Sequence, residues 1–349
     1  MLLEYDHPLA PHNTLALPAR AEWFLRSGSV DEIARQIRAS AEQDIPCTVI
    51  GEGSNIVLAA DIPGLVIQPA LRGVEKLSQD ADSVVIRAAA GENWDSLVRL
   101  TLEKGWYGLE NLSLIPGSVG AAPVQNIGAY GCELADYIEQ IEALNLEDGE
   151  LQVFSRACCQ FAYRDSFFKS VEPGRWLITS VQFRLWRSPR MNLEYADLQA
   201  QFQAMPAEKR NPIGLRELVC QLRKSKLPDP AELANVGSFF KNPVVDAASY
   251  DELLQQYPDL VAFALPGGEY KLAAGWLIEK AGWKGRRLGP VGMHKRQALV
   301  LVNYGGATSS DVLLLASEVV EDIRKMFSVE LEQEPVLLPR GIQVATPPL

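Results

Sequence analysis

The feature that most constrains this chain is a stretch of small residues, GLENLSLIPGSVGAAPVQNIGAYG, which runs from Gly108 to Gly131. It has too little bulk to build a core. Long loops are usually functional or disordered, and this one is too apolar to be disordered. Missing Cβ atoms let the backbone approach a flat or phosphorylated molecule closely. Ser118, Gln125 and Asn126 add neutral hydrogen-bonding groups. The stretch therefore predicts a cofactor cradle; the alternative is an irregular loop packed on a sheet.

A second glycine-rich segment, GEGSN at 51–55, follows a short predicted strand. Successive backbone N–H groups at such a turn can form a nest that binds an anion. The segment is not GxGxxG and no helical pattern follows it, so it does not indicate a Rossmann site. Together the two glycine-rich segments favour a cofactor that carries phosphate.

Composition limits the function classes. A chain of 349 residues exceeds the usual size of one domain, and its 47% hydrophobic content is ordinary for a folded protein. The net charge of −11 argues against a general nucleic-acid or anionic-membrane surface, so an anionic substrate needs a local basic pocket. We find no signal-peptide pattern and no apolar run near the roughly 20 residues of a membrane span. The five cysteines lack CxxC spacing, which indicates reduced thiols in the cytoplasm.

Hydrophobic periodicity predicts both helices and strands. Asp148-Gly149 predicts a hairpin, Ser249 to Glu252 predicts a capping box that opens a helix, and Pro228 with Pro230 suggests a domain boundary. Trp176 to Trp186 alternates like a half-buried strand. The other predicted helices cover 32–43, 94–103, 214–224, 272–280 and a segment from Ser310, and the other strands cover 47–50, 56–58, 64–67, 84–88, 138–146, 151–154 and 298–303.

Polar residues in distant segments could carry chemistry. Arg164 could anchor a carboxylate through a bidentate contact, or it could simply pair with Asp165 at a loop edge. Ser238 lies outside any GxSxG pattern and has no evident histidine partner, which leaves the role of proton donor open.

Two further patterns are ambiguous. Glu330, Glu332 and Glu334 would share one face of a strand, and their spacing alone favours a solvated edge. A local basic pocket could be formed by Lys226, Lys271, Lys284 and Arg286. The sequence lacks a Walker A motif, HExxH, zinc-ligand spacing and a haem motif, so a metal enzyme and an NTPase are both disfavoured.

With these segments in view, the chain closely resembles the UDP-N-acetylenolpyruvoylglucosamine reductases, the MurB family of flavoenzymes. The matching motifs occur in the family's order over nearly the full length, which makes the resemblance specific. They are GEGSN, GENW at 91–94, the stretch from Gly108 to Gly131, YRDS at 163–166, KLPDP at 226–230, GSFFKNP at 237–243, KLAAGWLIEKAGWKG at 271–285, HKRQALVLVN at 294–303 and LEQE at 331–334.

The resemblance implies an α+β chain with an FAD-binding fold of the vanillyl-alcohol-oxidase (PCMH) type and a C-terminal α+β substrate-binding domain. The implied domains are 1–70 completed by 328–349, 71–225, and 226–327. NADPH would reduce FAD, and a hydride would then convert UDP-N-acetylglucosamine enolpyruvate to UDP-N-acetylmuramate in peptidoglycan precursor synthesis. The partners would be these small molecules, without nucleic acid or membrane, and the protein would be a cytoplasmic monomer.

The resemblance also assigns roles to residues. Arg164 would stabilise charge on the substrate, Ser238 would protonate C2, with Lys226 as the hypothetical neighbour that lowers its pKa, and Glu334 would help to hold the enol form. The implied FAD-binding residues are Gly51, Gly53, Ser54, Asn55, Ile115, Pro116, Gly117, Ser118, Gly120, Ala121, Asn126, Ile127, Gly128, Tyr130 and Arg223. The implied substrate-binding residues are Tyr163, Tyr195, Lys226, Asn242, Lys271, Lys284 and Gln297, and no metal is implied.

The chain departs from the family pattern at two places. Leu265-Pro266 stands where Tyr-Pro is usual, and Pro335 follows Glu334 where an arginine is common, so Glu332 remains a rival for the catalytic carboxylate. A flavin oxidase of the same fold and a non-catalytic flavin-binding relative are the alternative functions. The substrate motifs KLPDP and GSFFKNP, with Tyr195, favour the reductase over the oxidase. The presence of Arg164, Ser238 and Glu334 argues against a non-catalytic relative.

Overall fold

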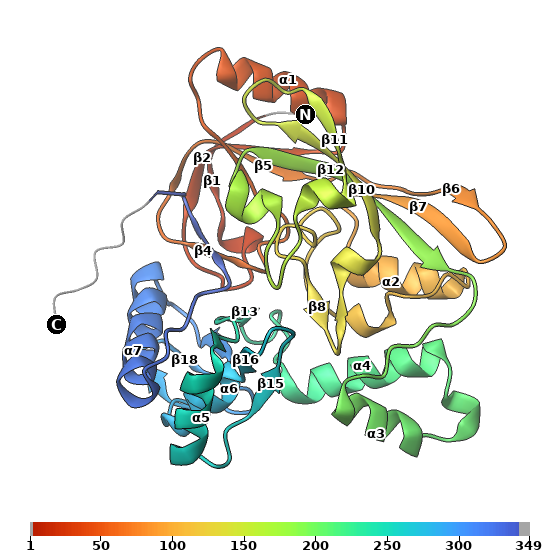
Figure 1. Cartoon of the computed structure of the whole chain (residues 1–349). Helices are drawn as coiled ribbons and strands as arrows, with labels where there is room; N and C mark the ends of the chain where they lie inside the picture. The colour runs from red at the N-terminus through yellow and green to blue at the C-terminus, as the bar shows by residue number, and fades with distance from the viewer. Residues whose placement is uncertain (1–2, 342–349) are drawn as a thin grey trace. The chain divides into compact units, whose positions relative to one another are not determined.

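The computed structural model describes residues 3–341, which divide into two compact units (Figure 1). Both units mix helices and strands, so the predicted α+β class is confirmed. The first unit comprises Ala21–Glu52, Ile62–Ser225 and the segment up to His7; the second comprises Pro8–Arg20, Gly53–Asp61 and the chain from Lys226 onward.

A four-stranded sheet in the first unit has the order β1-β2-β5-β3, and β2, β5 and β3 run parallel. Helix α1 (Val30–Ala41) connects β2 to β3, and its buried residues Ile33 and Ile37 recur at helical spacing. Ser29 caps this helix by accepting the N–H of Glu32. The strands are β1 (Glu4–Pro8), β2 (Arg20–Ser27), β3 (Cys47–Val49) and β5 (Ile62–Pro69).

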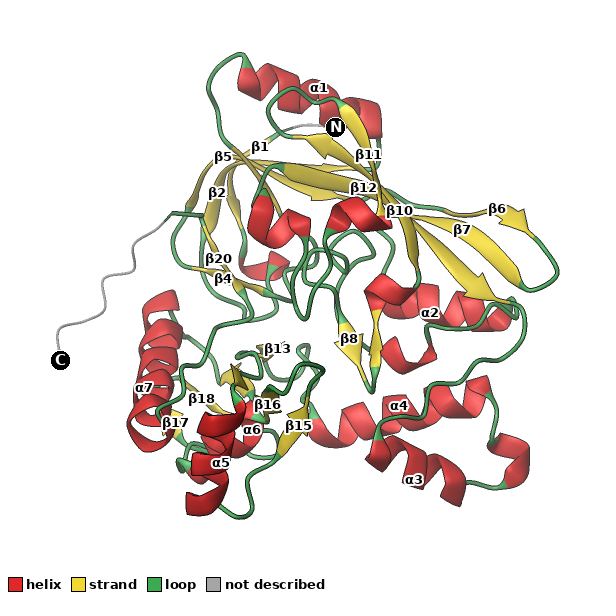
Figure 2. Ribbon diagram, viewed as in Figure 1, coloured by secondary structure: helices red, strands yellow, loops and turns green. Residues whose placement is uncertain are grey.

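The second sheet of this unit is antiparallel, with the order β11-β10-β12-β7-β6 (Figure 2). The predicted hairpin at Asp148-Gly149 is confirmed: β10 pairs with β11, and Gly149 has a φ of +69°. Helix α2 (Trp94–Glu103) follows β7 with the predicted bounds. The strands are β6 (Val74–Gln79), β7 (Ser83–Ala89), β10 (Ile138–Asn145), β11 (Leu151–Ser155) and β12 (Trp176–Trp186).

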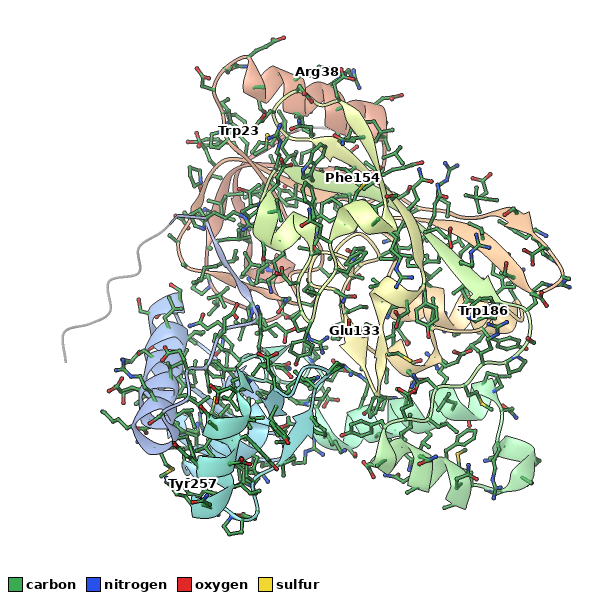
Figure 3. The ribbon with its side chains drawn as sticks, viewed as in Figure 1. Trp23, Arg38, Glu133, Phe154, Trp186 and Tyr257 are labelled. Carbon is green, nitrogen blue, oxygen red and sulfur yellow. The ribbon has the colours of Figure 1, made fainter. Side chains whose placement is uncertain are left out.

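Strand β12 is more buried than its alternating pattern predicts. Thr179 and Ser180 are buried although both are polar. β12 is the central strand of its sheet, and its first half is covered on both faces. Near it, the ring of Phe154, labelled in Figure 3, packs against Phe168 and Trp176 at centroid distances of 5.1 and 4.8 Å.

Helices α3 (Ala196–Ala204) and α4 (Pro212–Lys226) close the first unit around a small core of their own. Leu198 and Phe202 of α3 are buried with Leu215, Leu218, Val219 and Leu222 of α4. The predicted helix at 214–224 is therefore confirmed. Helix α4 ends at Lys226, two residues before Pro228. This end is expected, because a proline disfavours helical backbone at the residue before it.

Up to residue 341, the second unit is built from short strands and three α-helices. Its sheets have the orders β13-β19-β18-β17 and β14-β16-β15, and β20 runs parallel to β4. The strands are β4 (Ile56–Leu58), β13 (Asn235–Ser238), β14 (Val244–Val245), β15 (Ala262–Ala264), β16 (Tyr270–Leu272), β17 (Arg287–Leu288), β18 (Val291–Met293), β19 (Val300–Asn303) and β20 (Val336–Leu338). The helices are α5 (Ala247–Gln256), α6 (Ala274–Lys280) and α7 (Ser309–Phe327).

The core of the second unit draws on distant segments. Leu15, Leu17 and Val57 are fully buried in the same cluster as residues of α6 and α7. These N-terminal pieces therefore belong with the chain from Lys226 onward and not with the rest of residues 1–70. The predicted three-domain division and the two compact units have one boundary in common, after Ser225. The three-domain division stays a prediction.

Two predicted helix starts are wrong, and the strand that would align the three glutamates is absent from the described residues. Asp246, not Ser249, is the N-cap of α5: its carboxylate accepts the N–H of Ser249, so the helix starts three residues earlier. Residues 270–272 form β16, and α6 begins only at Ala274. The segment that carries Glu330, Glu332 and Glu334 forms no strand, because its contact with the Phe240 segment is a single bridge at Gln333. The tail after Pro339 lies largely outside the described residues.

Candidate active site

The glycine-rich stretch is an irregular loop whose backbone is held by the residues before and within α2. Val119 N–H donates to the carbonyl of Glu92 and Gly120 N–H to that of Ala90, both at 2.9 Å. In the other direction, Trp94 N–H donates to the carbonyl of Gly117 at 3.0 Å, and its indole donates to that of Leu112 at 2.8 Å. Protein contacts therefore define the shape of the cradle.

Gly120 is required where the loop approaches Ala90, and Gly51 lies in a tight contact with the same loop. A Cβ at Gly120 would lie 2.5 Å from the Cβ of Ala90. A Cβ at Gly51 would lie 3.1 Å from both the Cβ of Ala121 and the Oγ of Ser118. The first glycine-rich segment therefore meets the second within the first unit, at residues that sequence analysis assigned to FAD.

The segment GEGSN is divided, because Gly51 and Glu52 belong to the first unit and the next three residues to the second. Gly53 has a φ of +68°, and a Cβ there would lie 2.1 Å from the carbonyl of His12, so this glycine is needed for packing. The amide nitrogen of Asn55 is buried and has no hydrogen-bond partner among the described residues. A buried donor without a protein acceptor suits a ligand that carries phosphate or ring acceptors, as FAD does.

Asn126 uses its side chain within the protein. Its amide donates to Glu133 at 2.8 Å and to the carbonyl of Ala162 at 3.0 Å, and its oxygen accepts the N–H of Ala135 at 3.0 Å. Glu133 lies on the hairpin of β8 (Gly128–Ala129) and β9 (Cys132–Glu133), where Figure 3 labels it. Asn126 is fully buried and therefore supports the loop that carries Gly128 and Tyr130.

Arg164 occupies an unusual backbone conformation beside the cradle. Ala162 and Asp165 exchange backbone hydrogen bonds, and Arg164 between them has a φ of +56°, a region that favours glycine. Its guanidinium donates to the carbonyl of Gly128 at 2.8 Å and lies 5.3 Å from the ring of Tyr163. The carboxylate of Asp165 accepts the N–H of Ser166 and the hydroxyl of Ser170. The Arg164 side chain therefore contacts the cradle, whereas the Asp165 side chain binds residues that follow it in its own loop.

Two tyrosines and a half-buried arginine lie near the glycine-rich loop in the first unit. The rings of Tyr130 and Tyr195 meet edge to face at 5.4 Å, and Tyr195 directly precedes α3. Tyr130 has a φ of +49°. Burial lowers the pKa of Arg223, whose Nε donates to the carbonyl of Leu114 at 3.3 Å. Tyr195 and Arg223 come from distant segments of the sequence and contact the loop, which carries Tyr130 and Leu114, only in the folded unit.

In the second unit, the segments of Ser238 and Glu334 lie side by side. Glu334 N–H donates to the carbonyl of Phe239 and Lys241 N–H to that of Glu332, both at 2.9 Å. Ser238 ends β13, next to this pairing. Glu332 forms an ion pair with Lys241 at 2.5 Å, and the side chain of Glu332 is 71% exposed.

Several predicted substrate-binding residues already have protein partners. The Asn242 side chain accepts the N–H of Ala274 at the start of α6, at 2.9 Å. Lys284 forms an ion pair with Glu279 at 2.8 Å. Arg286, from the predicted basic pocket, lies 4.0 Å from the ring of Trp283. The other three fall on α4 (Lys226), β16 (Lys271) and the loop before β19 (Gln297).

Sequence reasoning missed three residues that support the cradle. Asp95 accepts the N–H of Leu114, and Asn111 donates to the carbonyls of Tyr130 and Asn192 at 2.9 and 3.0 Å. The amide of Asn192 in turn donates to the carbonyl of Gly131. Two polar residues enclosed by leucines, Glu110 and Asn111 in GLENL, are the signal that could have identified Asn111.

Comparison with known proteins connects both halves of the chain to one enzyme family. Residues 21–155 match the family model described as FAD binding domain. Residues 229–338 match the model described as UDP-N-acetylenolpyruvoylglucosamine reductase, C-terminal domain.

Full-length relatives carry the same name. UDP-N-acetylenolpyruvoylglucosamine reductases from Alcanivorax borkumensis and Pseudomonas fluorescens are 52% and 50% identical, over 96% and 94% of this chain and 96% of each relative. The crystal structure of the UDP-N-acetylenolpyruvylglucosamine reductase (MurB) from Thermus caldophilus matches with a TM-score of 0.65 and 26% identity, over 97% of this chain and all of the other. With the two domain matches, these similarities confirm the predicted FAD-binding fold and C-terminal domain.

Proposed function

The chain belongs to the UDP-N-acetylenolpyruvoylglucosamine reductase family, and from that premise we propose which residues carry its reaction and which donor supplies it. Members of the family are flavin oxidoreductases, and this one reduces the enolpyruvyl group of UDP-N-acetylglucosamine enolpyruvate in peptidoglycan synthesis. NADPH is the proposed electron donor. We further propose that the enzyme is a cytoplasmic monomer that does not bind nucleic acid; residues 3–341 contain no helix long and apolar enough to cross a membrane.

The observation that carries the residue assignment is the left-handed turn of Arg164. Strained backbone persists where surrounding structure enforces it, and it clusters at functional sites. Here the strain directs a guanidinium to the carbonyl of Gly128 in the cradle. FAD, when bound, supplies the hydride that C3 of the enolpyruvyl group receives. Negative charge then builds on C2 and the carboxylate, and a fixed cation stabilises that charge. This is the role proposed for Arg164.

Ser238 is the proposed donor of the proton that C2 receives. A serine hydroxyl is a weak acid, so a neighbouring cation must lower its pKa, and Lys226 is the proposed neighbour. Glu334 is proposed to hold the enol form. The backbone hydrogen bond between Glu334 and Phe239 supports a joint role with Ser238, and the exposed ion pair of Glu332 with Lys241 argues against the rival carboxylate.

The remaining assignments follow the family pattern at matching positions. FAD contacts are proposed for the glycine-rich residues 51–55 and 115–130 named above and for Arg223. Substrate contacts are proposed for Tyr163, Tyr195, Lys226, Asn242, Lys271, Lys284 and Gln297. The ion pair of Lys284 with Glu279 is half-exposed, so exchanging the carboxylate for a pyrophosphate oxygen would cost little.

The direct test uses the purified protein without oxygen. We expect a flavin spectrum that NADPH bleaches and that UDP-N-acetylglucosamine enolpyruvate restores, with UDP-N-acetylmuramate as product. A flavin that NADPH reduces but only oxygen reoxidises would favour an oxidase of the same fold. A protein that binds flavin without turnover would favour a non-catalytic relative. Size-exclusion chromatography with light scattering tests the monomer.

A further inference from the structure

Leu114 is a strained residue immediately before the predicted flavin-binding residues Ile115 to Ser118. It has a φ of +57°, a conformation that a leucine rarely adopts because its Cβ crowds the following carbonyl. The direction in which the chain enters Ile115 depends on this single dihedral. The fold must therefore supply contacts that keep Leu114 left-handed.

Both peptide groups of Leu114 are held by charged side chains. Its N–H donates to Oδ1 of Asp95 at 2.8 Å, and its carbonyl accepts from Nε of Arg223 at 3.3 Å. Hydrogen bonds with an ionised partner are stronger than neutral ones. The two contacts together select the direction of both peptide planes, which is what fixes a backbone dihedral.

Asp95 is itself held in place. Its second oxygen, Oδ2, accepts from Nη2 of Arg216 at 2.7 Å, and both side chains are largely buried. Arg216 and Arg223 lie seven residues apart on α4, which puts them on the same face of the helix two turns apart. Asp95 lies in the first turn of α2, next to Trp94, which already holds Leu112 and Gly117. One carboxylate thus connects α2, α4 and the loop.

We propose that Asp95 is a positioning residue of the flavin site, which holds Leu114 in the left-handed conformation so that Ile115 to Ser118 face the cofactor. The inference rests on the proposed binding of FAD by this loop. Arg216 orients the carboxylate, and Arg223 holds the opposite side of the same residue. Asp95 does not touch the reacting atoms; it acts through the backbone that it orders.

The test measures FAD affinity of apoprotein by flavin fluorescence. Asp95→Ala removes the acceptor, and we expect FAD to bind at least about tenfold more weakly, because the left-handed conformation of Leu114 is disfavoured by about this factor when nothing holds it. Asp95→Asn keeps an acceptor oxygen, and we expect affinity within about threefold of the wild type, since neutral hydrogen bonds are about half as strong as charged ones. Glu103→Ala, an exposed change on the same helix, is the matched control. Equal affinity of wild type and Asp95→Ala would overturn the proposal.

A second variant separates positioning from folding. Glycine adopts positive φ without strain, so Leu114→Gly should need no support from Asp95. We expect Asp95→Ala with Leu114→Gly to bind FAD as tightly as Leu114→Gly alone, with the flavin absorption bands at the wild-type positions. This comparison also tests the positioning role of Asp95 if Asp95→Ala by itself fails to fold. A double variant that binds about tenfold more weakly than Leu114→Gly would contradict the proposal, since the loss would then come from the unpaired N–H at position 114 and not from the left-handed conformation. A wild-type protein that binds no FAD would instead contradict the proposed function.

Discussion

At the scale of residues, the catalytic assignment separates two half-reactions. Ser238→Ala should leave reduction of the flavin by NADPH unchanged, because that step needs no proton on C2. Reoxidation by the enolpyruvyl substrate should slow by about 10²–10⁴, the usual contribution of a positioned acid. Anaerobic stopped-flow absorbance measures each half separately. Ser310→Ala, an exposed serine of the same unit, is the control. Equal slowing of both halves would show that Ser238 acts elsewhere.

Glu110 should make the stability of the fold, and not the reaction, depend on pH. It is buried, Oε2 accepts the N–H of Gly108 at 2.8 Å, and Oε1 has no partner among residues 3–341. Burial raises the pKa of its carboxyl above the ordinary 4.5. Between the unfolded and the folded pKa, the folded state binds more protons, so the free energy of unfolding falls as pH rises through that window.

Glu110→Gln should remove this dependence, because its amide stays neutral. We expect the wild type to lose stability relative to the variant as pH rises above the ordinary carboxyl value, by ~1.4 kcal/mol for each unit of raised pKa. Denaturant unfolding at a series of pH values from about 4 upward measures the difference. A constant difference between the two proteins across this range would contradict the assignment.

At the scale of elements, side chains at helix starts determine boundaries that periodicity alone misplaces. Helix α7 was predicted from Ser310, but Thr308 caps it: the Thr308 hydroxyl accepts the N–H of Asp311, and the Asp311 carboxylate accepts the N–H of Thr308. Val312, Ala316, Val319 and Ile323 recur at helical spacing, and all four are fully buried. Periodicity therefore located the buried face, while cap geometry located the end.

This cap predicts a matched pair of variants. Thr308→Ala should lower the free energy of unfolding by about 1 kcal/mol, the usual cost of a lost N-cap. Ser310→Ala, two residues along the same exposed turn, should change it by less than about 0.5 kcal/mol. Urea unfolding followed by circular dichroism measures both. Equal losses in the two variants would mean that the helix starts where periodicity placed it.

At the scale of the whole molecule, the second unit depends on segments from the first 61 residues. Leu15, Leu17 and Val57 are fully buried in its core, and β4 supplies the partner of β20. Burying each such side chain stabilises a fold by about 1.5–3 kcal/mol, so losing three removes much of a typical domain's stability of about 5–15 kcal/mol. A continuous C-terminal fragment cannot retain these contacts.

We therefore expect a fragment of residues 226–341 to show no cooperative thermal transition, although the family model for the C-terminal domain covers residues 229–338. Circular dichroism melting of the fragment, beside the full-length chain, provides the measurement. A cooperative transition of the isolated fragment would mean that Leu15, Leu17 and Val57 are dispensable for its core.

By itself, the sequence determined the α+β class, the family and most elements, because local periodicity, turn chemistry and a long series of motifs are all present in consecutive residues. Only the tertiary structure decided what supports the loop. Asp95 on α2 and Arg223 on α4 hold Leu114, and Arg216 orients Asp95. The side-chain amides of Asn126 and Asn111 donate hydrogen bonds to carbonyls of residues distant in the sequence. A side chain's partner across a fold depends on how its elements pack, and a hydrogen bond between residues far apart in the chain leaves no periodic pattern in the sequence.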